Sequence, residues 1–212
     1  MNKIFLLCGL FISATTLFSQ PNDELYKKSI DALNNGKFEE SIGHLDKILK
    51  SDSRHKDALF LRAYIYYNIK DFDKALTDLD SLVSVDTTNL EALKNRSRTK
   101  FALQDNKGGI LDIDKMIQID PQNEIYYFDR AYYKGMAFDL EGSIKDYDKA
   151  IELNPKYTEA YANRGFAKIN LLTTKGNIMP TKEQTADACK DLKKAKQLGD
   201  KTVEDMLFIY CK

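Results

Sequence analysis

A helical hairpin pattern recurs along this chain at a spacing of 34 residues. The turn inside each hairpin shows the period most clearly, since Phe38 and Phe72 stand 34 residues apart in similar segments. Segments that start at Asp105 and Asp139 continue the series. A two-helix unit of this length cannot bury its apolar face alone, so successive units stack into a solenoid with a concave binding surface. The period therefore predicts an all-α protein that acts by binding.

The same places of successive repeats hold residues of the same size. The eighth place is always small and the fourth place is always large, which lets neighbouring helices approach closely and fills the seam between them. Prolines at 121 and 155 end the third and fourth repeats, because proline cannot continue a helix. The repeats fall at 22–55, 56–89, 90–123, 124–157 and 158–200, with an insertion at about 173–182.

The segment from Asp148 to Pro155 is close to the consensus of the tetratricopeptide repeat (TPR) family, which the chain resembles over about residues 22–200. The resemblance implies a right-handed α-solenoid of about five TPR helix-turn-helix units over residues 20–212, with a capping helix over 201–211. The first repeat departs from the consensus at Lys28, as an atypical terminal repeat does.

Residues 1–19 have the composition of a secretory signal peptide. A lysine precedes a mostly apolar run from Ile4 to Leu17, which is too short for a membrane span. We expect an exported protein, either periplasmic or secreted, without a membrane span in the mature chain. Acylation of Cys8, as in a lipoprotein, is the weaker alternative because Leu7 stands where a small residue is required.

Charge and composition exclude several function classes. The 32 basic and 32 acidic residues balance, which argues against a nucleic-acid or anionic-membrane surface. The two histidines, His44 and His55, do not have metal-ligand spacing. The sequence also lacks a phosphate-binding glycine loop and a nucleophile elbow. We therefore expect no enzyme activity, no metal and no cofactor.

Two cysteines remain once the signal segment is removed, and an exported chain permits them to form a disulfide. The helical spacing of Val203, Met206 and Tyr210 predicts a final amphipathic helix after Gly199. Antiparallel folding about Gly199 would bring Cys189 and Cys211 together, so we predict a disulfide between them. Two free buried thiols are the alternative.

Arginine and aspartate recur at fixed places of the repeats. Arginine forks match carboxylates in geometry, so this pattern predicts ion pairs between helices and an architectural role for the acids. The first repeat lacks both residues and has Lys28 and His44 instead. The arginines are Arg62, Arg96, Arg130 and Arg164, the aspartates are Asp78, Asp112, Asp146 and Asp191, and the pairs are expected either within a repeat or with the neighbouring repeat.

In the TPR family the inner groove is lined by the first helix of each repeat, where places five, nine and twelve form one stripe. In this chain the stripe is rich in aromatic residues and has a basic patch at its middle, which suits an extended or helical peptide. In the alternative reading, some of these rings pack between helices as core. The candidate groove residues are Tyr26, Phe60, Tyr64, Tyr67, Lys94, Arg98, Phe101, Phe128, Tyr132 and Phe166.

These observations predict a non-enzymatic scaffold of the cell envelope that binds a protein or peptide segment in its concave groove. An assembly factor or accessory subunit of an envelope complex, working through the convex face, is the second hypothesis. A small hydrolase that uses the 173–182 loop is the hypothesis from another class, and it lacks a nucleophile and a base. The partner and the oligomeric state stay open.

Overall fold

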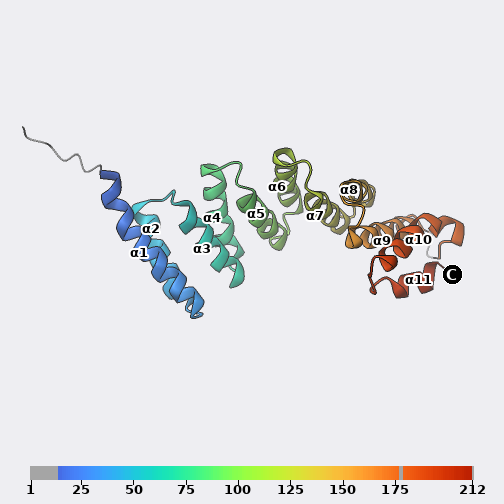
Figure 1. The fold of residues 1–212 in the computed structure, drawn as a ribbon, viewed down its shortest axis with the longest axis horizontal. Helices are drawn as coiled ribbons and strands as arrows, with labels where there is room; N and C mark the ends of the chain where they lie inside the picture. Colours follow the sequence, from blue (N-terminus) through green and yellow to red (C-terminus); the bar gives the residue numbers. More distant parts are fainter. Residues whose placement is uncertain (1–13, 177–178, 212) are drawn as a thin grey trace, which may run out of the picture. The chain divides into compact units, whose positions relative to one another are not determined.

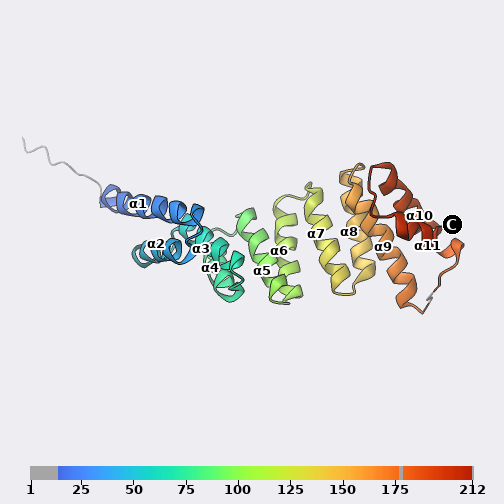
Figure 2. The same cartoon turned by 90° about the horizontal axis from the view of Figure 1, so that it is seen from below.

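The computed structural model describes the backbone of residues 14–176 and 179–211, and within these ranges all regular secondary structure is helical, without a strand (Figures 1 and 2). The chain divides into two compact bodies between Val85 and Asp86. Most of the predicted signal segment 1–19, including Cys8, lies outside the described residues. None of the described helices is long and apolar enough to cross a membrane.

The amino-terminal body consists of two helical hairpins, with α2 of the first packed on α3 of the second. Its first helix is the longest and has Pro21 inside it. Pro21 is also the second residue after the predicted signal segment. The helices are α1 (Ala14–Asn34), α2 (Phe38–Ser51), α3 (Lys56–Asn68) and α4 (Phe72–Val85).

The carboxy-terminal body continues with three hairpins and a final short helix, which packs on α10 (Figure 2). Consecutive hairpins of this body pack on each other through contacts between α6 and α7 and between α8 and α9. The helices are α5 (Leu90–Ala102), α6 (Asn106–Ile119), α7 (Glu124–Met136), α8 (Leu140–Leu153), α9 (Thr158–Thr174), α10 (Lys182–Gln197) and α11 (Glu204–Tyr210).

The helices keep the period of the sequence. The second helices α2, α4, α6 and α8 begin 34 residues apart, and so do the first helices α3, α5, α7 and α9. The all-α solenoid fold class predicted from this period is confirmed.

Small residues bring the two helices of a hairpin into contact. In the first hairpin, the hydroxyls of Ser29 and Ser41 lie 2.9 Å apart, and both residues are fully buried. In the third hairpin, the Ser97 hydroxyl donates to the Gly109 carbonyl over 2.9 Å. In the fifth, a Cβ at Gly165 would lie 2.8 Å from Leu192 Cδ2. Larger residues at these places would push the helices apart.

Ion pairs join the first helix of a hairpin to two second helices. The Arg130 guanidinium donates to Asp146 of its own hairpin, with Nε 2.8 Å from the carboxylate, and its Nη1 lies 2.6 Å from Asp114 of the preceding hairpin. Arg62 binds Asp78 and Asp46 in the same way. Arg164 repeats the arrangement with Asp191 and Asp148, and Arg96 donates to Asp112. This network stabilises the stack.

The first hairpin has no such pair between its own helices. At the equivalent places, Lys28 binds Glu24 one turn away on the same helix, and the Nδ1 atom of His44 is buried without a hydrogen-bond partner. A buried polar atom without a partner destabilises the folded state. The seam of this hairpin therefore rests on apolar packing, on the two buried serines and on the Ser51 hydroxyl, which donates to Asn22 over 3.1 Å.

The turn inside four hairpins places one residue in the left-handed region of φ. The first hairpin uses Gly36 there, whereas later hairpins use Lys70, Gln104 and Phe138 at φ of 63° to 64°. Such a conformation is unfavourable for a residue with a Cβ. The side chain of Phe138 is also 82% exposed, so it gains little from packing.

Phe138→Gly is therefore expected to raise the free energy of unfolding by about 1 kcal/mol, because glycine adopts this φ without strain. Urea unfolding monitored by circular dichroism measures the change. Gly36→Ala, at the same place of the first hairpin, should instead lower the free energy of unfolding. A loss of stability in Phe138→Gly would show that the ring packs in solution.

The carboxy-terminal end is held by several interactions. A disulfide joins Cys189 on α10 to Cys211 just after α11, and the Thr185 hydroxyl donates to the Tyr210 carbonyl over 2.9 Å. Helix α11 begins at Glu204, three residues later than the sequence predicts, because Asp200 accepts hydrogen bonds from the amide and hydroxyl of Thr202 and holds a turn there.

The insertion in the fifth repeat includes residues 177 and 178, which lie outside the described residues. On its amino-terminal side, Lys175 pairs with Glu141 at the start of α8 over 3.0 Å. On its carboxy-terminal side, Thr181 and Gln184 form a capping box that begins α10. Both ends of the insertion are thus anchored to helices of the stack.

Candidate functional site

Four of the candidate groove residues converge on one cavity of about 500 Å³, here called the central cavity. Lys94 and Arg98 line it from α5, and Phe128 and Tyr132 line it from α7. Each pair lies one helical turn apart, so both side chains of a pair share a face of their helix. Buried Ile113 and Met116 of α6 contribute apolar surface, and the remaining lining residues are Ser97, Ile125, Asp129, Tyr133 and Asn163.

The basic side chains of the central cavity are not committed to the ion-pair network. Arg98 is exposed, and its guanidinium forms no ion pair with any residue that the structure describes. Lys94 lies 3.7 Å from Glu91, at the limit of an ion pair. By contrast, Lys100 on the same helix binds buried Asp112 over 2.9 Å. Lys94 and Arg98 are therefore available to an incoming partner.

Asp129 adds a carboxylate to the same cavity. Burial raises the pKa of this carboxyl above its usual value, and the nearby charges of Arg98 and Lys94 oppose the shift without cancelling it. No described residue donates a hydrogen bond to its oxygens. Such a group destabilises the protein while the site is empty, and this is characteristic of binding sites.

Asp129→Asn is accordingly expected to raise the melting temperature by a few degrees at neutral pH. A carboxyl whose folded pKa lies above its unfolded value destabilises the fold while it is ionised. The penalty disappears as pH falls through the folded pKa, and it is absent below the ordinary pKa of this carboxyl in the unfolded chain. Calorimetry from pH 7 to pH 3 should show the two melting temperatures converging. A constant difference would attribute the gain to something other than charge burial.

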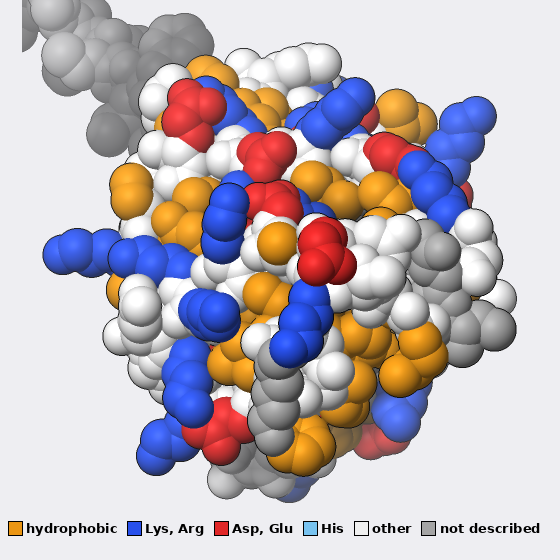
Figure 3. Space-filling view, turned by 90° about the vertical axis from the view of Figure 1, so that its right-hand side faces the viewer, with side chains coloured by type: hydrophobic (Ala, Val, Ile, Leu, Met, Phe, Trp, Pro, Cys, Tyr) orange, Lys and Arg blue, Asp and Glu red, His pale blue; other side chains and the backbone are white. Residues whose placement is uncertain are grey.

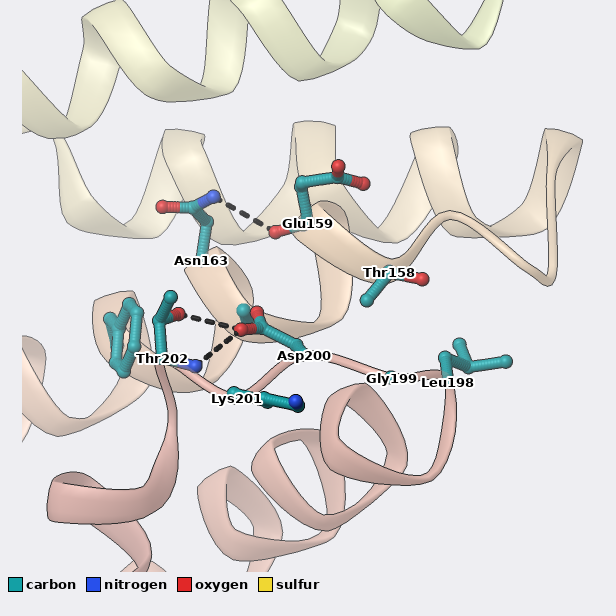
Figure 4. Close-up of a pocket in the computed structure, with 10 residues that line it drawn as sticks. Thr158, Glu159, Asn163, Leu198, Gly199, Asp200, Lys201 and Thr202 are labelled. Atoms are coloured by element: carbon teal, nitrogen blue, oxygen red, sulfur yellow. Dashed lines mark hydrogen bonds between the residues drawn. The ribbon is translucent and has the colours of Figure 1, made fainter.

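A second cavity of about 700 Å³, here called the terminal cavity, lies between α9 and the turn that joins α10 to α11. Figure 4 shows its walls. Thr158, Glu159 and Asn163 come from α9, and residues 198–202 form the facing turn. Phe166, another candidate groove residue, also lines this cavity. The turn thus closes one side of the surface that α9 presents.

Asn163 lines both cavities, so they form one continuous surface over α5, α7, α9 and the 198–202 turn, here called the groove. Its amide nitrogen donates to the Glu159 carbonyl over 2.8 Å (Figure 4). This bond leaves the amide oxygen available to a ligand. The groove belongs entirely to the carboxy-terminal body.

The other candidate groove residues have different surroundings. Phe101 stacks on Tyr133 and covers Gly109, where a Cβ would lie 2.6 Å from the Phe101 ring. This ring therefore packs between helices. In the amino-terminal body, Tyr26 stacks on His55 and Phe60 is half-buried. Tyr64 and Tyr67 are exposed on α3 by 51% and 36%.

Asp129 and Asn163 are among the groove residues that the stripe of places five, nine and twelve missed. Both stand at the sixth place of their repeat, one residue after the fifth. The sixth place is also polar in the third repeat, at Asn95. A polar residue recurring beside an aromatic stripe was the signal that could have identified them.

The rest of the described surface offers little chemistry of another kind. The end of the molecule that carries α11 has acidic, basic and apolar side chains interspersed (Figure 3). Among the residues described, no three His, Cys, Asp or Glu side chains gather as a metal site would require.

Comparisons with known proteins agree with this architecture. Tetratricopeptide repeat models match residues 26–86 and 139–171. No curated protein matches the chain. A crystal structure of MamA protein superposes with a TM-score of 0.72 at 21% identity, covering 92% of this chain and 97% of that one.

Two further solved structures have the same fold. MamA from Desulfovibrio magneticus RS-1 superposes with a TM-score of 0.70 at 16% identity, covering 84% of this chain and 94% of that one. YrrB, described as a TPR protein with an unusual peptide-binding site, gives a TM-score of 0.68 at 14% identity, with coverage of 88% and 94%.

Proposed function

Since this chain is a tetratricopeptide repeat protein, we propose that it is a non-enzymatic scaffold that holds a protein or peptide segment in the groove over α5, α7 and α9. The observation that carries the proposal is the central cavity. There, exposed Arg98 and half-buried Asp129 lie beside apolar walls without forming hydrogen bonds to described residues. Aromatic and arginine side chains in a concave site are the usual anchors of a bound segment.

The similarity to YrrB supports a peptide as the bound species, since that protein is described by its peptide-binding site. An extended segment would offer both amide donors and carbonyl acceptors. Asp129 and the Asn163 oxygen accept hydrogen bonds, and Arg98 donates them. The groove therefore has partners for both kinds of backbone group.

The proposed place of action is outside the cytoplasm, in the periplasm or beyond the cell. The support is the apolar run after a lysine within residues 1–19 and the spacing of the cysteines that form the disulfide. Mass spectrometry of protein purified from its native source tests it. A mature amino terminus at about residue 20 is expected, and an intact Met1 in the mature pool would contradict export by this route.

Site-specific photo-cross-linking tests the groove. A benzophenone amino acid placed at Tyr132, on the wall of the central cavity, should cross-link the natural partner in the native source. The same probe at Leu111, which is 58% exposed on the second helix α6, is the matched control. A cross-link from position 111 and none from position 132 would contradict the proposal and favour an accessory subunit that binds through its other face.

A further inference from the structure

We propose that the segment held in the groove is bipolar, with an acidic end over α5 and a basic end at the terminal cavity. This inference rests on the proposed function and adds the chemistry of the partner. It follows from charged side chains at the two ends of the groove, among which Arg98, Glu159 and Asp200 form no ion pair with any described residue.

At the α5 end, the excess charge is positive. Lys94 and Arg98 line the central cavity, and Asp129 is the one acid among its lining residues. The structure shows no ion pair that consumes the Arg98 charge, whereas the fold commits Arg62, Arg130 and Arg164 to buried aspartates. A carboxylate from a partner would find an open guanidinium and an ammonium one helical turn apart.

At the α9 end, the excess charge is negative. Glu159 and Asp200 both line the terminal cavity, and no described residue forms an ion pair with either carboxylate. One oxygen of Asp200 accepts from Thr202, which fixes the carboxylate in place (Figure 4). Lys201 is the only basic residue among the lining residues, and it forms no ion pair with either described carboxylate.

The same cavity suits the stem of a long basic side chain. Phe166 and Leu198 contribute apolar surface beside the two carboxylates. Lysine and arginine bury their methylene stems on such surface while the charged head reaches an acid. The terminal cavity therefore fits a basic residue better than an apolar one.

The two ends are separated by the width of two repeats. Neighbouring packed helices lie about 8–10 Å apart, so α5 and α9 are about 20 Å apart along the groove. An extended chain spans this with about six residues. Phe128 and Tyr132 between the ends would contact the apolar middle of the segment.

Fluorescence anisotropy with synthetic peptides tests the inference. Three peptides of about eight residues share a Leu-Phe-Leu centre and carry at their two ends either Asp and Lys, Asp and Asp, or Lys and Lys. The peptide with Asp at one end and Lys at the other is called the mixed peptide. In each of the other two peptides, one end meets groove residues of its own charge, so attraction is lost and repulsion is added. The wild-type protein should therefore bind the mixed peptide about tenfold more tightly than the others. Raised salt should reduce this preference.

Charge reversals assign the two ends. Glu159→Lys should weaken binding of the mixed peptide and strengthen binding of the peptide with Asp at both ends. Arg98→Glu should strengthen binding of the peptide with Lys at both ends. Lys107→Glu, exposed on α6, is the control and should change none of the affinities by more than about twofold. Circular dichroism establishes that each variant is folded.

The outcomes separate this inference from the proposed function. Equal affinity for the three peptides, or unchanged preference in Glu159→Lys and Arg98→Glu, would overturn the bipolar segment even if Tyr132 cross-links the natural partner. Loss of the Tyr132 cross-link would instead remove the groove function itself. Tightest binding of the Asp and Asp peptide would show that the acidic residues of the terminal cavity do not select a base.

Discussion

Asp146→Ala is expected to lower the free energy of unfolding by about 3 kcal/mol, which corresponds to a fall in melting temperature of about 10 °C. The Asp146 carboxylate is buried, and it accepts from Arg130 and from Lys134 at 2.8 Å. Removal of the acid would leave two partly buried cations one turn apart on α7, without the α8 carboxylate that neutralises them. Thermal and urea unfolding of the variant measure the loss.

Asp114→Ala is the matched control for this change. Asp114 binds the same Arg130 guanidinium, but its side chain is 36% exposed, so water replaces the lost carboxylate. We expect a loss of about 1 kcal/mol or less. Equal losses in the two variants would mean that burial does not decide the strength of these pairs.

Cys211→Ser is expected to lower the free energy of unfolding by about 3 kcal/mol, because the disulfide closes a loop between residues 22 apart in the sequence. The cross-link removes conformations from the unfolded chain, and in the folded state it fastens α11 to α10. Chemical unfolding with and without dithiothreitol measures the effect.

The internal control is the double variant Cys189→Ser with Cys211→Ser. The same bond is lost in both variants. The free energy of unfolding of the double variant should therefore lie within about 1 kcal/mol of that of the single variant. Dithiothreitol should destabilise only the wild-type protein. Two reactive thiols under denaturant, in protein purified from its native source, would contradict the pairing.

The sequence could predict the architecture because each repeat solves the same packing problem. Small residues such as Ser97 and Gly165 occur where two helices touch. Every stacked hairpin requires them, so the pattern recurs in each repeat of the sequence. The arginine and aspartate places follow the same logic, and the structure shows the guanidinium forks that their spacing implies.

The candidate groove was harder to predict because the position of a residue in a repeat fixes its direction only approximately. Phe101 and Arg98 belong to the same stripe, yet Phe101 covers Gly109 while Arg98 lines the central cavity. A bulky ring next to a glycine fills the space that the missing side chain leaves. Whether a ring faces the groove therefore depends on the residues of the second helix of the hairpin. The stripe is defined by first-helix places only, so it does not include this information.

The terminal cavity could not be predicted from the repeat at all. It exists because residues 198–202 turn back over α9, where a further repeat would otherwise continue the stack. That turn depends on Gly199 at φ of 105° and on the Asp200 hydrogen bonds to Thr202. These are local events that occur once, so no period reveals them.

The unpartnered Nδ1 atom of His44 in the first hairpin has a consequence for how the protein opens. In a repeat protein each hairpin contacts only its neighbours, so a terminal hairpin with weak contacts opens at a lower free energy than the rest. The carboxy-terminal end is fastened by the disulfide, whereas among the described residues the seam between α1 and α2 has no arginine fork and contains a buried nitrogen without a hydrogen-bond partner. Amide hydrogen exchange should therefore be fastest in α1 and α2, so unfolding has a direction along the chain.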